Sequence, residues 1–176
     1  LQERYRGEGI TTVSANLKEH PLPLVDANFD MVIMCEVLEH LNFNPLPVLS
    51  EVNRFLRPGG LIYLALPNLA SLPNRAKLLL GRSIHNPVDD FRAQLSADDN
   101  MIVGLHWREY TCAEPQERLR LAHFQAQQHA FLNIDGSCLP ARLLYRFFPG
   151  LRPAQVVTAR KLGEHGLDLS FTAATR

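Results

Sequence analysis

The pattern of apolar and polar positions predicts strands alternating with helices. Residues 31–34 (MVIM) and 61–66 (LIYLAL) are continuous apolar runs, typical of strands that are covered on both faces. Between them, apolar residues recur at helical spacing over 45–56. Asn44 can cap this helix, and Arg57-Pro58-Gly59-Gly60 would end it. Because short crossover connections are right-handed, we expect the two strands to be parallel neighbours.

The rest of the chain predicts shorter elements. The β-branched segment 10–15 favours a strand that ends at Asn16-Leu17. The sequence Thr111-x-x-Glu114, followed by Pro115, is a helix-start signal. We expect a loop at 20–28, a helix at 70–82, an irregular segment at 83–104, a helix at 111–124, a short apolar stretch at 143–148, and strands near 127–132 and 155–160.

The composition is that of a single globular domain. The 176 residues include 18 basic and 18 acidic side chains, so no global positive field favours binding of nucleic acid. The three cysteines are widely spaced and odd in number, which favours reduced thiols and a cytoplasmic protein. No apolar run approaches the roughly 20 residues that cross a bilayer, and the start of the chain does not resemble a signal peptide.

Polar residues at the carboxyl ends of the two central strands mark the predicted binding edge. Open parallel sheets bind ligands at these ends, here Cys35-Glu36 and Pro67-Asn68. Glu39-His40 lies just beyond the first strand, and His106 follows the irregular segment. A histidine titrates near neutrality, so His40 and His106 are candidate general bases. The alternatives are a hydrogen-bonded helix-start residue for His40 and packing or capping of the next helix for His106.

We expect no metal site from the sequence alone. Asp89-Asp90 and Asp98-Asp99 do not have the ligand spacing of a calcium loop. His123 and His129 are predicted on different elements, which disfavours zinc. The basic, leucine-rich stretch 75–82 could rest on a membrane surface, but packing of its leucines on the sheet is the favoured interpretation.

Three segments, in order and at suitable spacing, resemble the class I S-adenosylmethionine-dependent methyltransferases. They are FDMVIMCEVLEHL, FLRPGGLIYLALPN and HWREYTCAEPQERLRLAHF, which begin at Phe29, Phe55 and His106. They look most like the ubiquinone-pathway and other small-molecule enzymes of that family. The resemblance implies an α/β, Rossmann-like, open and mostly parallel sheet with helices on both faces and a C-terminal antiparallel hairpin. It spans residues 10–124, with the final strands as the hairpin.

The resemblance also implies roles for individual residues. S-adenosylmethionine would be the cofactor, with Asn16 and Leu17 near its adenine and Cys35 and Glu36 near its methionine part. Alternatively, Asn16 simply ends a strand and Cys35 is structural. In the substrate opening, the resemblance implies contacts from Asn68, Trp107 and Tyr110.

The family's glycine-rich loop after its first strand has no counterpart here, since Gly7-Glu8-Gly9 follows no apolar strand. We therefore expect residues 1–162 to be a partial methyltransferase domain that lacks two strands, with a tail at 163–176. The expected activity is methyl transfer to a small molecule, such as a sugar, glycan or quinone-precursor hydroxyl. The alternative is a non-catalytic remnant that acts through protein interaction. A nicotinamide oxidoreductase ranks lower, because it needs a G-x-G-x-x-G turn.

Overall fold

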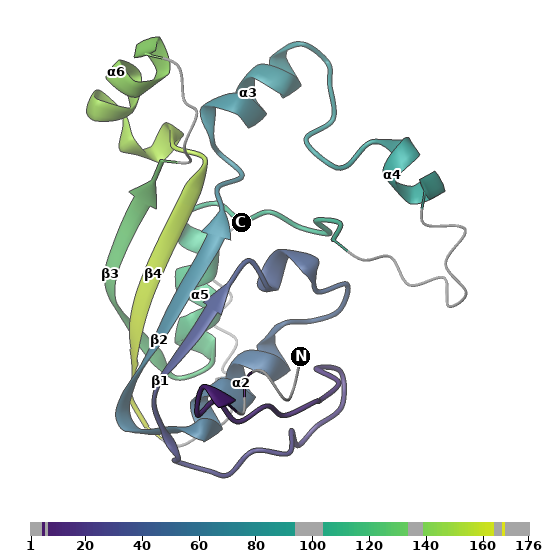
Figure 1. The fold of residues 1–176 in the computed structure, drawn as a ribbon. Coiled ribbons are helices and arrows are strands. Elements are labelled where there is room, and N and C mark those ends of the chain that lie inside the picture. Colours follow the sequence, from purple (N-terminus) through teal and green to yellow (C-terminus); the bar gives the residue numbers. More distant parts are fainter. Residues whose placement is uncertain (1–4, 6, 94–103, 134–138, 164–166, 168–176) are drawn as a thin grey trace.

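A mixed four-stranded sheet forms the centre of the computed structural model, which describes residues 5, 7–93, 104–133, 139–163 and 167. The strands of these residues are β1 (Phe29–Cys35), β2 (Leu56–Pro67), β3 (Phe124–Leu132) and β4 (Ala154–Lys161). Their order across the sheet is β1-β2-β4-β3 (Figure 1). Asp98-Asp99 and nearly all of the predicted tail lie outside the described residues.

The predicted parallel neighbours are confirmed. β1 and β2 pair in parallel, with Val32 opposite Ile62 and Cys35 opposite Ala65. Helix α2 (Leu46–Phe55) connects them, and the Asn44 side-chain oxygen accepts a hydrogen bond from the Leu46 amide at 3.1 Å. α2 ends at Phe55, as the stop signal at 57–60 predicted, and residues 57–60 lie in an irregular first part of β2, where the register with β1 shifts.

The expectation of a mostly parallel sheet is wrong. Only β1 and β2 are parallel, whereas β4 runs antiparallel to both β2 and β3. The reason is that β4 inserts between β2 and β3, so one reversed strand sets the direction of two of the three pairings. The predicted C-terminal antiparallel pair is confirmed, with Phe124 opposite Lys161 and Leu132 opposite Ala154.

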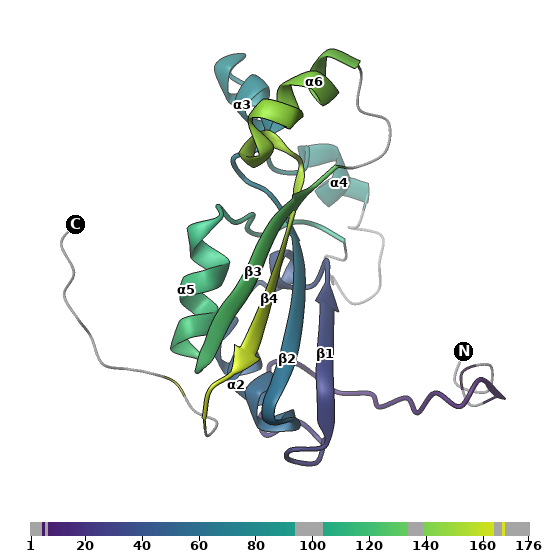
Figure 2. The same ribbon diagram turned by 90° about the vertical axis from the view of Figure 1, so that its left-hand side faces the viewer.

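The helices that pack on the sheet lie on one face. α5 (Ala113–Leu121) contacts β3, β4 and α2, and α2 contacts β2. Figure 2 shows both helices on the same side of the sheet. The core lies between them and the alternate residues of β2, among them Ile62, Leu64 and Leu66. On the opposite face Ile33 is 65% exposed, and within the described residues no helix packs there. The expectation of helices on both faces is therefore wrong.

The predicted strand at 10–15 is absent from the structure. These residues are extended but pair with no strand in the part of the chain that is described, and Ile10 and Val13 are about half exposed. β-branched residues fit a pleated surface between neighbours, and their propensity does not form a strand without one. Local composition was thus misleading at this position.

Three further helices lie beyond the carboxyl end of the sheet: α3 (Leu72–Leu79), α4 (Val88–Ala93) and α6 (Leu139–Phe147). α4 falls in the segment predicted to be irregular, and α6 overlaps the apolar stretch at 143–148. Leu79 and Leu80 are 88% and 70% exposed, so the expectation that these leucines pack on the sheet is wrong. Contact of this stretch with a membrane surface, the less favoured alternative, is not tested by the structure. Among the described residues, no helix has the length and apolar character to cross a bilayer.

Candidate active site

The chain reverses sharply where β1 ends. Glu36 has a φ of 53°, in the left-handed region that residues other than glycine adopt uncommonly. Its amide donates a hydrogen bond to the Ala65 carbonyl at 3.1 Å, which fastens the turn to β2. The short 3-10 helix η1 (Leu38–His40) follows. Cys35 is exposed rather than buried, so Cys35 and Glu36 lie at an accessible rim, and their contact with a cofactor stays a prediction.

Asn68 closes the end of β2. Its side-chain nitrogen donates hydrogen bonds to the carbonyls of Gly150 and Arg152, both at 2.8 Å, and its side-chain oxygen accepts one from the Ala70 amide at 3.0 Å. The residue is 1% exposed and forms an isolated parallel bridge with Tyr110. Its side-chain amide therefore joins residues 68–70 to residues 150–152, and its predicted contact with a substrate stays untested.

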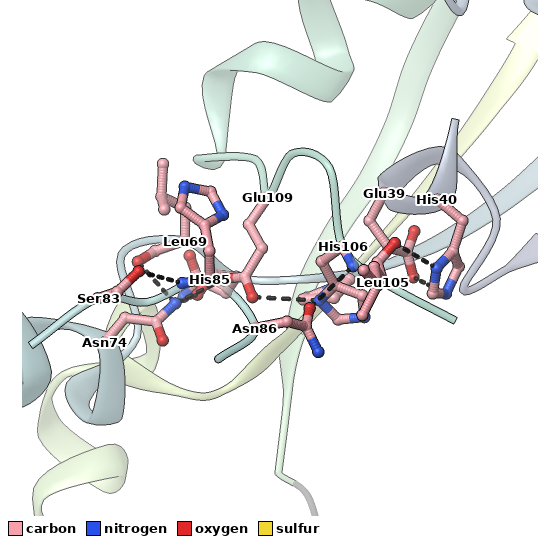
Figure 3. Close-up of polar contacts among 12 residues, drawn as sticks. Glu39, His40, Leu69, Asn74, Ser83, His85, Asn86, Leu105, His106 and Glu109 are labelled. Carbon is pink, nitrogen blue, oxygen red and sulfur yellow. Dashed lines mark hydrogen bonds and ion pairs between the residues drawn. The ribbon is translucent and has the colours of Figure 1, made fainter. Parts of the chain in front are cut away.

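The two predicted bases meet at this edge of the sheet. The Trp107 amide donates a hydrogen bond to the Glu39 carbonyl at 2.7 Å, which ties residues 105–110 to η1. His40 Nδ1 lies 3.0 Å from the carbonyl oxygen of Leu105. These contacts bring the His40 and His106 rings to a centroid separation of 5.0 Å and an interplanar angle of 72° (Figure 3).

A second set of polar contacts orients His106. Its Nδ1 lies 3.3 Å from Oε1 of Glu109, and its backbone amide donates to the Asn86 side-chain oxygen at 3.1 Å. The other carboxylate oxygen of Glu109 accepts a 2.6 Å hydrogen bond from the Asn74 side chain. Glu109 thus orients the His106 imidazole, and Asn74 in turn fixes the Glu109 carboxylate. Acid–base sites often orient the base through a third group in this way.

Glu39 is the unusual member of this cluster. Its side chain is fully buried, and neither carboxylate oxygen has a hydrogen-bond partner among the described residues. His40 Nε2 lies 3.9 Å from its Oε1. Burial, together with the neighbouring carboxyl groups of Glu36 and Glu109, raises the pKa of Glu39 to about 8. A buried carboxyl group with no hydrogen-bond partner and a raised pKa is a recognised sign of a functional site.

Trp107 and Tyr110 have different surroundings. Trp107 is 40% exposed and lies edge-on to Phe91. It borders a hollow of about 380 Å³ that is lined by Leu69, Ile84, His85, Trp107, Arg108, Glu109 and Glu114. Tyr110 is only 2% exposed, with Arg118 over its ring, and burial raises the pKa of its hydroxyl. Trp107 is therefore accessible from the hollow, whereas Tyr110 packs in the core, and the predicted substrate contacts of both stay predictions.

Asn16 and Leu17 lie in a turn rather than at a strand end. The Asn16 side chain donates to Glu19 Oε1 at 2.8 Å and accepts from the Lys18 amide at 3.1 Å. Leu17 lines an apolar hollow of about 560 Å³ beside β1, together with Met31 and other residues. Their predicted contact with adenine stays a prediction.

Sequence reasoning missed the residues that hold the histidines in place. Asn86, Leu105 and Glu109 come from loop segments without apolar periodicity. One signal could have found Glu109, because it follows His106 by three residues, a spacing at which a carboxylate can reach a ring nitrogen. Glu39 was noted only as the neighbour of His40, and its burial could not be read from the sequence.

Comparison with known proteins finds similarity to methyltransferases. Residues 1–64 match a family model described as a methyltransferase domain. A probable S-adenosylmethionine-dependent methyltransferase of Mycolicibacterium smegmatis is 36% identical over 112 residues, which are 64% of this chain and 34% of that protein. The chain spans about a third of the length of the curated relatives that it matches.

Solved structures share the fold at low sequence identity. An S-adenosylmethionine-dependent methyltransferase from Mesorhizobium loti has a TM-score of 0.55 at 16% identity, covering 90% of this chain and 74% of that one. A chain of the complex that contains the Haloferax volcanii Trm112 methyltransferase activator also has a TM-score of 0.55 at 16% identity, covering 94% and 68%. The matched segment makes the chain similar to S-adenosylmethionine-dependent methyltransferases, and the solved structures show that it shares their fold.

Proposed function

We propose that the protein transfers a methyl group from S-adenosylmethionine to a small molecule. Residues 35–40 and 105–110 would bind this acceptor and remove its proton. The acceptor would be a hydroxyl, as in a sugar, glycan or quinone precursor. The observation that carries this proposal is the meeting of His40 and His106 at the carboxyl ends of β1 and β2. Open α/β sheets bind their ligands at such ends.

Methyl transfer from a sulfonium needs alignment above all. The acceptor oxygen bonds to the methyl carbon while the carbon–sulfur bond breaks, so the protein mainly brings the two centres into line. A neutral hydroxyl must also lose its proton. His40 or His106 could accept it, because a histidine near neutrality is a suitable base. The half-exposed Trp107 beside the open hollow would hold an apolar or ring-shaped acceptor.

The cofactor would lie along the rim formed by Cys35 and Glu36. These residues come directly after β1, and the Glu36 amide is already bonded to Ala65. The exposure of Cys35 leaves the backbone at this rim open to a ligand. Leu17 and the apolar hollow beside β1 would serve the adenine ring, as the family resemblance implies.

The test measures cofactor binding and methyl transfer separately in the full-length protein. Calorimetric titration with S-adenosylhomocysteine should show binding. Incubation with methyl-labelled S-adenosylmethionine and a panel of sugars, glycans and phenols should label a hydroxyl compound. A full-length protein that is folded and binds no S-adenosylhomocysteine would contradict the proposal.

A non-catalytic role in protein interaction is the second candidate. It is favoured by the apolar outer face of β1, where Met31 is 42% and Ile33 is 65% exposed. An open strand with apolar side chains is a ready template for pairing with another chain. Labelled product from any acceptor would decide for the enzyme. Cofactor-independent capture of a defined partner, lost on Ile33→Lys, would decide for the interaction role.

A further inference from the structure

Three potential metal ligands converge beside the rim of the sheet. Glu39, His40 and His106 each offer one ligand atom, and these atoms all lie within 4.8 Å of one another (Figure 3). Metal–ligand distances of about 2.0–2.2 Å require the atoms to close by about 1 Å, which side-chain rotation supplies. Two of the three ligands come from η1, and the third comes from the segment that is fastened to it.

Both histidines are held in the tautomer that metal binding needs. The Leu105 carbonyl can only accept a hydrogen bond, so His40 Nδ1 must donate to it. A carboxylate likewise only accepts, so His106 Nδ1 donates to Glu109 Oε1 at 3.3 Å. Each ring then keeps a lone pair on Nε2. Metal-bound histidines are typically oriented in this way, by a carbonyl or carboxylate on the other nitrogen.

The third ligand is a carboxylate without a partner. Glu39 is fully buried, and both of its oxygens lack a hydrogen bond within the described part of the chain. Buried polar groups in proteins are normally hydrogen-bonded, and buried carboxylates are paired or coordinate metals. A cation between Glu39 and the two imidazoles would satisfy all three groups.

We propose that Glu39, His40 and His106 bind one divalent transition-metal ion such as Zn²⁺. Glu109 would orient His106 from outside the coordination sphere. Two imidazoles and one carboxylate are a donor set found in zinc enzymes and in iron enzymes that keep open coordination positions. Carboxylate- and water-dominated sites suit Mg²⁺ and Ca²⁺ instead, so these ions should bind much more weakly.

The role of the ion in catalysis rests on the proposed function. An acceptor hydroxyl bound at an open position would lose its proton more readily, because a divalent ion lowers the pKa of a bound hydroxyl. The proton would pass to water, the oxygen would bond to the methyl carbon, and the carbon–sulfur bond would break to give S-adenosylhomocysteine. The two histidines would then position the ion rather than act as bases.

Metal binding can be tested without cofactor or acceptor. The 176-residue chain is freed of metal with a chelator and titrated calorimetrically with Zn²⁺, with Co²⁺ absorption in the visible range as a second readout. We expect about one ion per chain, and Mg²⁺ should not compete. His40→Ala, His106→Ala and Glu39→Gln should each weaken binding by more than about 100-fold, and Glu109→Gln by roughly 10–100-fold.

His85→Ala is the matched control, because His85 is exposed and lies outside the ligand cluster. It should bind Zn²⁺ as the unsubstituted chain does. Far-UV circular dichroism establishes that each variant is folded, and Glu109→Gln gives an independent test that leaves all three ligands in place. The proposal is wrong if the unsubstituted chain binds neither ion, or if folded ligand variants bind as tightly as it does. A positive result with no methyl transfer would overturn the proposed function and leave the metal site standing.

Discussion

His40 and His106 are 66 positions apart in the sequence, yet their rings stand edge to face with centroids 5.0 Å apart. The Glu39 carbonyl and the His40 ring both bond to the segment that carries His106, so the pair is fixed from two sides. This arrangement joins η1 and residues 105–110 into one site at the carboxyl end of β1.

Loss of either histidine should impair turnover rather than cofactor binding. In the full-length protein we expect His40→Ala and His106→Ala each to lower kcat by about 10²-fold or more, the typical contribution of a positioned acid–base group. The dissociation constant for S-adenosylhomocysteine should change little. Steady-state kinetics and calorimetry on the same preparations check this, with His20→Ala as the control, because His20 is exposed and lies outside the candidate site. Equal losses in turnover and in cofactor affinity would argue against the assigned roles.

The core under β2 should dominate the stability of the sheet. Leu64 is 1% exposed and lies between the sheet and its two packed helices. Leu64→Ala should lower the free energy of unfolding by about 2–5 kcal/mol, because it removes buried methyl groups and leaves a cavity. Urea unfolding measures this. Leu79→Ala is the control, since Leu79 is 88% exposed, and it should change stability by less than about 0.5 kcal/mol.

The Glu51 carboxylate on α2 should make the free energy of unfolding depend on pH in the acidic range. A hydrogen bond from Arg54, at 2.8 Å, is the main cause that lowers the pKa of Glu51 below 4.5, and the Leu22 amide adds a second at 2.7 Å. Because the folded-state pKa is the lower one, this contribution is complete above the unfolded pKa. It is lost as the pH falls through the folded value.

Glu51→Gln should therefore lower the free energy of unfolding near neutrality by about 1.5–3 kcal/mol, the range for hydrogen bonds to charged groups. The difference from the unsubstituted chain should shrink below about pH 4. Thermal unfolding over a pH series measures both effects, and Asp89→Asn on exposed α4 is the control. A difference that stays constant down to pH 2 would contradict the assignment.

We expect Asn68 to stabilise the fold rather than to contact the substrate. Asn68→Ala removes the amide that bridges Gly150 and Arg152 and leaves their carbonyls without it. We expect a loss of about 1–3 kcal/mol in the free energy of unfolding. Hydrogen exchange should also quicken at residues 150–153. An unchanged stability with a raised KM would instead support direct substrate contact.

The sequence predicted the centre of the fold because local and long-range signals agree there. The apolar runs of β1 and β2, the helix between them and the short connection leave one arrangement, a parallel pair. The prediction failed at 10–15, where β propensity has no neighbouring strand to act on. It also failed for the sheet direction, because the position of β4 between β2 and β3 depends on contacts far apart in the sequence.

The candidate site was partly predictable. His40 and His106 could be named because each follows a segment with a strong pattern, whereas their contact depends on how residues 105–110 fold onto η1. The buried state of Glu39 and the support from Asn86 and Glu109 depend on loops without periodicity. Apart from Glu109, which follows His106 at a spacing of three residues, these positions carry no local signal, so a structure is needed to find them.

The most direct test of the account is to locate the bound cofactor on the full-length protein. Labelled S-adenosylmethionine is cross-linked by ultraviolet light, and the protein is digested with trypsin and analysed by mass spectrometry. Because residues 19–53 contain no lysine or arginine, β1, Glu36 and His40 fall in one peptide, Glu19 to Arg54. We predict label in this peptide, lost with excess S-adenosylhomocysteine. Label confined to other peptides would contradict a methyltransferase site at the end of β1.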